Sequence, residues 1–443
     1  MESTITYIIF GTLLAVIAVP HWRKTAKHKR EAARTLDKNE KAGMLAPVTL
    51  HPKINVLTCI GCASCVRVCP EHVLGIVNGR ASIVSGLKCI GHGVCVEVCP
   101  VGAITLGFGK PRAGMEIPYY DENHQSNVPG LYIVGELGGI GLIKNAVGQG
   151  LKAMEDVLRK KRPRPANGYD VVIVGCGPAG IAAALACEAN KLKYVVLEQD
   201  EIGGTVLHYP RRKLVLTAPV DLPLYGRLKV SEITKEELLE IWKDIVTRFK
   251  LNILTKHKVD AIERNDAGLT VRTGGETFTS ATVFLAIGRR GSPRKLGVPG
   301  ENLPKVMYRL IDAESYKNKH LLVVGGGDSA VEAAVGLASQ RGNVVTISYR
   351  REEFVRLKEK NEKRVGEFIK TGKIKAIFNS AVLEIKPDAV VIQEAENILH
   401  NLQNHFVFVS AGGEMPTELL RKASVKLRES EVETKAKAKA EAA

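Results

Sequence analysis

The sequence predicts an α/β protein built around two Rossmann-like units, preceded by a small α+β domain and one apolar N-terminal helix. Two glycine fingerprints, each between an apolar strand and a helix rich in small residues, predict the two units. A cysteine pattern written twice within residues 59–100 predicts the small domain. The chain of 443 residues is long enough for several domains, and its 45% hydrophobic content is ordinary for a folded protein.

An uncharged apolar run at residues 4–20 opens the chain and is followed by Trp22 and basic residues. It is about the minimum length that spans a bilayer. Positive charges that follow the run favour an anchor over a cleaved secretory signal. A buried core helix is the alternative. We expect a transmembrane anchor at 1–22, in the inner membrane with the N-terminus outside and the other domains in the cytoplasm. A basic juxtamembrane linker at 23–50 would lie against lipid headgroups.

Residues 51–108 contain the doubled cysteine pattern, C-I-G-C-A-S-C-V-R-V-C-P and then C-I-G-H-G-V-C-V-E-V-C-P. The first copy is the run by which bacterial ferredoxins bind [4Fe–4S] clusters, with its fourth cysteine ligating the other cluster. A zinc site is the alternative, although zinc ligand pairs usually have longer gaps between them. The expected ligands of cluster I are Cys59, Cys62, Cys65 and Cys99, and those of cluster II are Cys69, Cys89, His92 and Cys95.

His92 stands where the second copy would have its second cysteine. Imidazole can ligate iron, so a cluster with three cysteines and one histidine is expected. A [3Fe–4S] cluster with His92 only nearby is the alternative. The two cysteines outside the pattern, Cys176 and Cys187, are expected to be buried and inert. Cysteines committed to clusters indicate a reducing compartment.

The first Rossmann unit is expected at residues 168–298. Its fingerprint, Gly175, Gly177 and Gly180, would let a pyrophosphate approach the N-terminus of the following helix. The next strand ends at Glu198, whose carboxylate can accept hydrogen bonds from ribose hydroxyls. Strand, turn, helix and terminal acid in this order predict a dinucleotide site.

The second unit is expected at residues 299–403, and its second strand ends in arginines rather than in an acid. Arginine forks suit a ribose 2′-phosphate, so NADPH is favoured over NADH; solvated surface arginines are the alternative. The different ribose signatures predict FAD in the first unit and NADPH in the second. The expected NADPH-binding residues are Gly325, Gly327, Asp328, Ser329, Ala330, Arg350, Arg351 and Arg356.

These residues resemble the thioredoxin-reductase-like family of FAD/NADPH flavoproteins, with a bacilliredoxin-reductase-like segment, H-Y-P-R-R, at 208–212. G-G-G-D-S-A-V-E-A-A resembles the NADPH-binding segment of that family, and residues 283–301 resemble its crossover between the two domains. In that family a segment that packs against the flavin ends the chain. Here its match, D-E-N-H-Q-S-N-V-P-G-L-Y-I-V-G-E at 121–136, precedes the first Rossmann strand.

We interpret this order as a circular permutation, which is tolerated where chain termini lie close together. The resemblance then implies that residues 109–163 belong to the FAD domain and that Gly135 and Glu136 contact FAD. Residues 404–425 would return to the FAD domain, and residues 426–443 would form a charged tail.

One departure from the family bears on the chemistry. Disulfide-reducing members carry a redox C-x-x-C before the NADPH fingerprint, whereas this chain has no cysteine after Cys187. Bacilliredoxin-reductase-like relatives have a cysteine where Ala179 stands. We therefore expect a membrane-anchored, NADPH-linked iron–sulfur flavoprotein oxidoreductase with no catalytic acid, base or nucleophile. A thiol or disulfide reductase using Cys176, and an electron-relay subunit of a larger membrane complex, are the alternatives.

The expected partners are NADPH, a lipid membrane and a redox partner, which could be a ferredoxin, a quinone, a cytochrome or another subunit. A homodimer is a further expectation. The net charge of +16 is concentrated in the segment after residue 22 and in R-K-K-R-P-R at 159–164. Because no nucleic-acid-binding motif accompanies either run, nucleic acid is not an expected partner.

Overall fold

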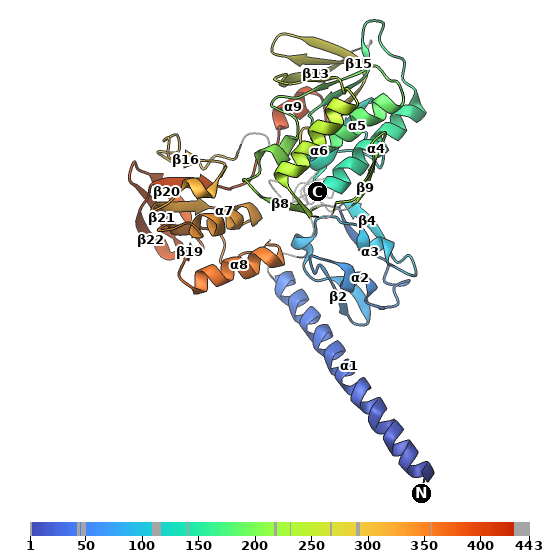
Figure 1. The fold of residues 1–443 in the computed structure, drawn as a ribbon, viewed down its shortest axis with the longest axis vertical. Helices are drawn as coiled ribbons and strands as arrows, with labels where there is room; N and C mark the ends of the chain where they lie inside the picture. The colour runs from blue at the N-terminus through green and yellow to red at the C-terminus, as the bar shows by residue number, and fades with distance from the viewer. Residues whose placement is uncertain are drawn as a thin grey trace, which may run out of the picture. The chain divides into compact units, whose positions relative to one another are not determined.

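The computed structural model describes residues 2–41, 45, 50–108, 117–139, 141–216, 219–230, 232–265, 268–288, 293–355 and 357–428. The chain forms two compact units, 1–109 and 110–443 (Figure 1).

The N-terminal segment is one continuous helix, α1 (Glu2–Lys41), rather than an anchor followed by a linker. The apolar run continues without a break into the basic residues, so the predicted anchor is only the first part of a longer, charged helix. Among the residues that the structure describes, no helix is long and apolar enough to cross a bilayer. This finding overturns the predictions of a transmembrane anchor and of an inner-membrane location.

The second half of α1 packs against the cysteine-rich domain. Ala32, Leu36 and Asn39 are partly buried at helical spacing, which places them on one face of the helix. The Asn39 side-chain amide donates to the Val84 carbonyl at 2.6 Å. A Cβ on Gly75 would lie 2.7 Å from the Ala32 Cβ, so a glycine there allows the close approach of helix and strand. Residues expected to form a linker are therefore part of this unit.

The cysteine-rich domain repeats one small motif, because each cysteine copy forms a short helix that leads into a strand. The strands form two antiparallel pairs, β1 with β4 and β2 with β3. The elements are β1 (Leu50–Ile54), α2 (Ser64–Val68), β2 (Leu74–Val77), β3 (Arg80–Ile83), α3 (Val94–Glu97) and β4 (Ile104–Phe108).

The second unit begins with a seven-stranded sheet in which β12, β7, β6, β15 and β5 are parallel, and β14 pairs antiparallel with both β15 and β13. Apolar residues fill both faces of β6 and β7, as expected of buried parallel strands. The strands are β5 (Leu131–Ile133), β6 (Tyr169–Val174), β7 (Tyr194–Leu197), β12 (Ile253–Leu254), β13 (Val259–Asn265), β14 (Gly268–Thr273) and β15 (Thr277–Leu285), and the helices are α4 (Ile143–Lys160), α5 (Pro178–Ala189) and α6 (Lys235–Arg248).

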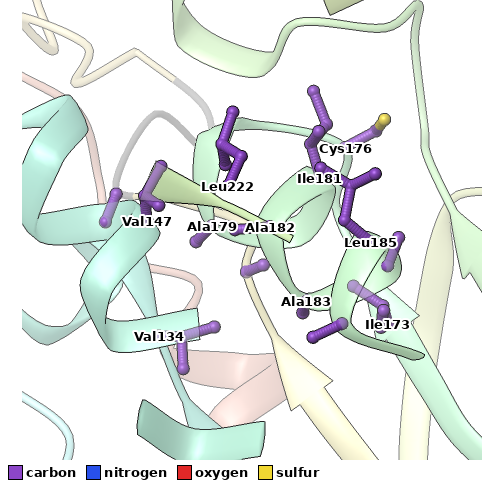
Figure 2. Packing of buried hydrophobic residues seen from close by; sticks show 14 of the residues in the cluster. Val134, Val147, Ile173, Cys176, Ala179, Ile181, Ala182, Ala183, Leu185 and Leu222 are labelled. Carbon is purple, nitrogen blue, oxygen red and sulfur yellow. The ribbon is translucent and has the colours of Figure 1, made fainter. Parts of the chain in front are cut away.

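Small residues let α4 and α5 pack closely (Figure 2). A Cβ on Gly150 of α4 would lie only 2.6 Å from the Ala179 carbonyl of α5. Val147 of α4 and most of the alanines of α5 belong to one buried core with Ile173 of β6. This contact holds α4 against the first turn of α5.

A second, five-stranded parallel sheet follows, in the order β16, β23, β17, β18, β19, with a three-stranded antiparallel sheet of β20, β21 and β22. Figure 1 shows α7 and α8 beside these strands. The elements are β16 (Val306–Met307), β17 (His320–Val324), α7 (Asp328–Ala338), β18 (Val344–Ser348), α8 (Glu359–Lys370), β19 (Ile374–Ile377), β20 (Ala381–Ile385), β21 (Ala389–Glu394), β22 (Ile398–Gln403) and β23 (Phe406–Val409). Short pieces complete the unit: β8 (Leu214–Leu216) with β11 (Glu232–Thr234), β9 (Val220–Leu222) with β10 (Gly226–Leu228), and α9 (Thr417–Lys422).

The first and last described residues of the second unit lie side by side. Pro118 and Leu427 form an antiparallel bridge. On either side of it, the Tyr119 N–H donates to the Lys426 carbonyl, and the Arg428 N–H to the Ile117 carbonyl, both at 2.8 Å. Adjacent ends are what a circular permutation requires.

This seam gives a testable expectation for stability. Arg428 is partly buried, lies over the Tyr120 ring at 4.9 Å and donates to the Tyr120 carbonyl at 3.3 Å. A chain that ends at Ser424 should unfold at a temperature several degrees lower, because it loses these contacts and the seam hydrogen bonds. A chain that ends at Arg428 is the control. Equal melting temperatures, followed by circular dichroism, would contradict the role of the seam.

Candidate redox site

One cavity of about 1650 Å³ in the second unit unites residues predicted for both nucleotides. It lies at the carboxyl ends of β5, β6 and β7, where ligands bind in open α/β sheets. The predicted residues that line it are Gly135, Glu136, Gly175, Gly177, Glu198, Arg350 and Arg351.

The three glycines of the first fingerprint have different reasons to be glycine. Gly175 has φ +104°, and a Cβ there would lie 2.6 Å from the Ala286 carbonyl oxygen. A Cβ on Gly180 would lie 2.0 Å from the Gly175 carbonyl oxygen. A Cβ on Gly177 would meet only the Gly204 Cα, at 3.9 Å. A side chain on Gly175 or Gly180 would therefore collide with the protein's own backbone. The absence of a side chain on Gly177 instead keeps the space before α5 open, as a pyrophosphate requires.

Glu198, at the end of β7, is oriented by two backbone groups. Its carboxylate accepts from the Cys176 N–H at 2.6 Å and from the Asp200 N–H at 2.9 Å, and the residue is 6% exposed. A carboxylate has about four lone-pair sites, so it can still accept from a ribose in the cavity. The residues present thus fit an adenosine ribose beside the glycine turn.

Gly135 lies next to this turn although it precedes it in sequence. A Cβ on Gly135 would lie 3.3 Å from the Ala179 Cβ, and the Gly135 N–H donates to the Gln149 side-chain oxygen at 2.7 Å. Glu136 follows at the cavity wall. β5, which ends just before them, pairs with β15 in the first sheet. This is the placement that the permutation predicts.

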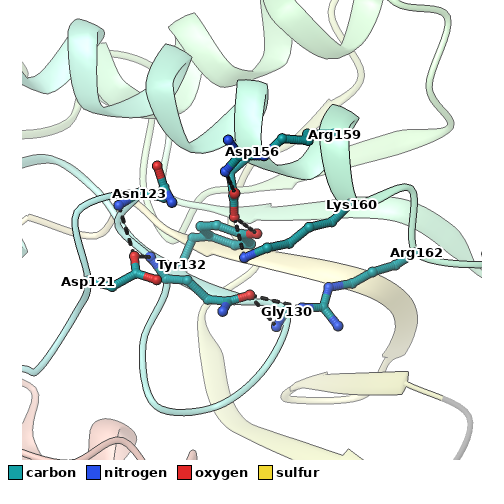
Figure 3. Close-up of polar contacts among 9 residues, drawn as sticks. Asp121, Asn123, Gly130, Tyr132, Asp156, Arg159, Lys160 and Arg162 are labelled. Carbon is teal, nitrogen blue, oxygen red and sulfur yellow. Dashed lines mark hydrogen bonds and ion pairs between the residues drawn. The ribbon is translucent and has the colours of Figure 1, made fainter.

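A buried polar network ties β5 to α4 (Figure 3). The Tyr132 hydroxyl donates to Asp156 at 2.8 Å, and Lys160 approaches the same carboxylate at 2.6 Å, with Arg159 on its other oxygen. Burial by itself would raise the pKa of Asp156, but the hydrogen bonds from Lys160, Tyr132 and Arg159 outweigh it and lower the pKa. The charged network therefore stabilises the strand and helix that hold Gly135 and Glu136.

The second fingerprint has a similar open turn. Gly325 has φ +140°, and a Cβ on Gly327 would have no neighbour within 4 Å. Gly327 and Ser329 are exposed at the start of α7, and Ala330 is buried. Asp328 also has a structural role: its carboxylate accepts from the Lys358 N–H at 3.0 Å and from Asn361 at 2.7 Å, which joins α7 to α8.

Arg350 and Arg351 follow β18 and line the cavity, so they lie where a ribose phosphate would be held. The Arg351 carbonyl accepts from the Asn379 N–H at 3.0 Å, which fixes its backbone. Arg356 lies outside the described residues.

In the first unit, the two cysteine copies have the same loop conformation. Gly61 and Gly91 have φ of +69° and +75°, and Ala63 and Gly93 have φ of +61° and +81°. His92, between the second glycine pair, therefore occupies the backbone position that Cys62 occupies in the first copy.

The structure brings together the predicted ligands of cluster II. Cys69, Cys89, His92 and Cys95 line one small cavity. The Val73 N–H lies 3.4 Å from the Cys69 sulfur. At the matching place of the other copy, the Ala103 N–H lies 3.2 Å from the Cys99 sulfur. Such N–H groups stabilise negative charge on the sulfur of a cluster.

The cluster I cysteines include two buried residues, Cys59 and Cys65. Burial raises the pKa of Cys65 to about 11, and the neighbouring Cys59 and Cys62 add to the rise. In the second group, burial likewise raises the pKa of Cys89 to about 11. Thiolates here need a compensating positive charge, which bound iron supplies.

In the described part of the chain, no three His, Cys, Asp or Glu side chains converge as ligands of one ion.

Comparisons with known proteins match both units of the chain. A family model described as "Pyridine nucleotide-disulphide oxidoreductase" matches residues 172–442. The chain belongs to this family. A model described as "4Fe-4S dicluster domain" matches residues 51–100. This pyridine nucleotide-disulphide oxidoreductase is therefore a FAD-dependent NAD(P)H oxidoreductase with two [4Fe–4S] clusters.

The curated relatives are similar over the second unit. The chain is 26% identical to bacilliredoxin reductase Bdr of Bacillus subtilis over 261 residues, 58% of this chain and 80% of the relative. It is 29% identical to a ferredoxin–NADP reductase of Ignicoccus hospitalis over 271 residues, 59% and 83% of the two chains. A thioredoxin reductase of Peptoclostridium acidaminophilum is 31% identical over 237 residues, 51% and 67% of the two chains.

A solved structure shows the same fold. The bacillithiol disulfide reductase Bdr (YpdA) from Staphylococcus aureus has a TM-score of 0.54 at 22% identity, covering 58% of this chain and 81% of its own. The resemblance to thioredoxin-reductase-like flavoproteins fused to a two-cluster ferredoxin domain is therefore confirmed.

This pyridine nucleotide-disulphide oxidoreductase has no accessible thiol in the described part of its second unit. Cys176 and Cys187 are both fully buried, as the sequence predicts. Burial, with Glu198 nearby, raises the pKa of Cys176 to about 12. An inaccessible, protonated thiol is a poor nucleophile, which argues against the thiol-reductase alternative.

Sequence reasoning largely missed the loop at 208–213, which joins the two nucleotide-binding parts of this oxidoreductase. His208 lines the cavity, and Arg309 donates to its Nδ1 at 2.9 Å, so the ring proton lies on Nε2, 3.4 Å from Asp200. Lys213 pairs with Glu332 of α7 at 2.8 Å. The sequence shows the run of basic residues in this loop. It does not show their acidic partners, because these lie about a hundred residues further along the chain.

Proposed function

We propose that this oxidoreductase passes electrons between NADPH and an external one-electron partner, through FAD and the two clusters of the same chain. The observation that carries the proposal is the cavity, which is lined by the residues predicted to bind FAD and also by Arg350 and Arg351. Both cysteines of this unit are buried. Electrons must then leave by a route other than dithiol exchange.

The bound flavin supplies the conversion between a two-electron hydride and single electrons, because nicotinamide carries pairs and clusters carry one electron each. Gly177 and the start of α5 would hold the pyrophosphate, and Glu198 the adenosine ribose. Glu136 would hydrogen-bond the ribityl or pyrophosphate region. Leu142, at the start of α4, lines the cavity, so the positive end of this helix would face the cofactor.

We assign the cluster ligands as the sequence predicts them, because the paired loop conformations and the shared cavity of the second group support that assignment. Cluster I would be held by Cys59, Cys62, Cys65 and Cys99, and cluster II by Cys69, Cys89, His92 and Cys95. The overall step is balanced: one NADPH gives NADP⁺, one proton and two electrons, which reduce two molecules of a one-electron partner.

A similarity to a ferredoxin–NADP reductase supports a protein as that partner. Anaerobic titration of the holoprotein with NADPH tests the proposal. Flavin absorbance should fall first, and cluster signals should then appear by electron paramagnetic resonance. Full flavin reduction with oxidised clusters, together with rapid reduction of bacillithiol disulfide, would instead support a thiol reductase.

Nucleotide preference should depend on Arg350 and Arg351. Replacing both by Ala should raise the KM for NADPH about a hundredfold or more while changing the KM for NADH little, since each of the two lost charge-assisted bonds is worth roughly 1.5–3 kcal/mol. Flavin reduction by each nucleotide measures this. Arg272→Ala is the control, because Arg272 is exposed and pairs with Glu263 in the first sheet. A wild type that prefers NADH would contradict the expectation.

A further inference from the structure

The first cysteine loop exposes unusually large apolar side chains. Val56, Leu57 and Ile60 are 57%, 89% and 59% exposed, and the Cys62 that follows them is also exposed. The Asn55 side chain accepts from the Leu57 N–H at 3.0 Å, which forms an Asx turn. A turn fixed in this way presents the apolar side chains in a rigid arrangement.

The second cysteine loop provides an internal comparison. Leu57 and Ile60 correspond to Leu87 and Ile90 thirty positions later, and both of these are only partly exposed. His92, at the position of Cys62, is likewise partly exposed. The exposure therefore belongs to the first copy and does not follow from the sequence pattern that both copies share.

Charge distinguishes the copies in the same way. Arg67 is exposed and donates to the Cys62 carbonyl at 3.3 Å and to the Ser64 hydroxyl at 3.1 Å. The matching residue of the second copy is Glu97. Gly61 packs against the turn at Gly79, because a Cβ on Gly61 would lie 2.1 Å from the Gly79 carbonyl oxygen. Arg80 follows this turn and is exposed. Residues 51–70 contain no Asp or Glu.

We propose that these residues form the docking site for an acidic protein that carries one electron at a time. We name the site the cluster I face, and it consists of Val56, Leu57, Ile60, Cys62, Arg67 and Arg80. An apolar centre with a charged rim is the usual anatomy of a protein interface, and opposite charge speeds encounter. Interfaces of electron-transfer partners are small, so a patch of this kind suffices.

The exposure of Cys62, a proposed ligand of cluster I, also favours electron transfer at this face. Transfer rates fall steeply with the distance between redox centres, and Cys62 would place cluster I at the surface. The proposal rests on the proposed function and adds the class of partner: one NADPH and two oxidised carriers give NADP⁺, one proton and two reduced carriers.

The test uses the full-length holoprotein and an acidic plant-type ferredoxin as the probe, with basic cytochrome c for comparison. Calorimetry should show that ferredoxin binds and cytochrome c does not, with affinity falling as salt rises. Leu57→Ser and, separately, Arg67→Gln should each raise the Kd for ferredoxin about tenfold. Ferredoxin reduction by NADPH should slow in parallel at low ferredoxin concentration.

Two control variants make the result specific. Leu399→Ser changes another exposed leucine, in β22, and Glu97→Gln changes the charge at the matching place of the second copy. Both should leave the Kd within twofold of the wild type. Equal loss in a control and a test variant, or no loss in either test variant, would overturn the proposal. Reduction of the protein's own flavin and clusters by NADPH is measured in every variant, and its failure in the wild type would count against the proposed function instead.

Discussion

Gly177→Val is expected to give a folded protein that contains almost no flavin. The glycine has an extended conformation that any residue can adopt, and a Cβ there would meet only the Gly204 Cα at 3.9 Å. The protein itself therefore tolerates the side chain at small cost. The pyrophosphate does not, because the added atoms would occupy the open space before α5. We expect the FAD content to fall at least tenfold while the melting transition persists.

Gly180→Val is the matched comparison, because it fails for a different reason. Its Cβ would lie 2.0 Å from the Gly175 carbonyl oxygen, which is backbone and cannot move aside. This variant should be poorly folded as well as free of flavin. Iron content provides an internal standard for both variants, since the clusters belong to the other unit. A Gly177→Val protein that retains full FAD would show that the turn does not bind the pyrophosphate.

Local patterns predicted the strands, turns and helices of both Rossmann units. The fingerprint glycines could be recognised because strand, turn and helix follow one another within some thirty residues. Gly135 and Glu136 could not be placed by such local signals. Their position beside Ala179 was predicted only by the resemblance to a family in which the same segment ends the chain.

Contacts between distant segments could not be predicted from the sequence. Asp328 is predicted to bind the nucleotide, and the structure adds a second role: its carboxylate is hydrogen-bonded at the start of α8, a contact that is known only once α7 and α8 are packed. The anchor prediction, which rested on the apolar run at residues 4–20 and on the basic residues after it, was wrong. In the structure, this run continues into a helix whose far end packs on the domain that follows.

Changing His92 should alter the reduction potential or the iron content of cluster II, depending on the residue that replaces it. If His92 is a ligand, the protein purified without oxygen should contain about eight irons and two [4Fe–4S] clusters. A neutral imidazole in place of an anionic thiolate makes the cluster less negative, and the potential rises, as it does in Rieske centres. His92→Cys should therefore lower the potential of one cluster by on the order of 100 mV and keep the iron count, whereas His92→Ala should lose one iron.

Cys62→His is the reciprocal change, because Cys62 and His92 occupy the same place in two loops of matching backbone conformation. It should raise the potential of cluster I and leave that of cluster II unchanged, as measured by redox titration with electron paramagnetic resonance. Cluster I would then be the more reducing centre in the wild type, which suits the cluster that passes electrons to a low-potential carrier at the cluster I face. A wild-type protein with about seven irons and a [3Fe–4S] signal would show that His92 is not a ligand. A His92→Cys variant with an unchanged potential would lead to the same conclusion by a second measurement.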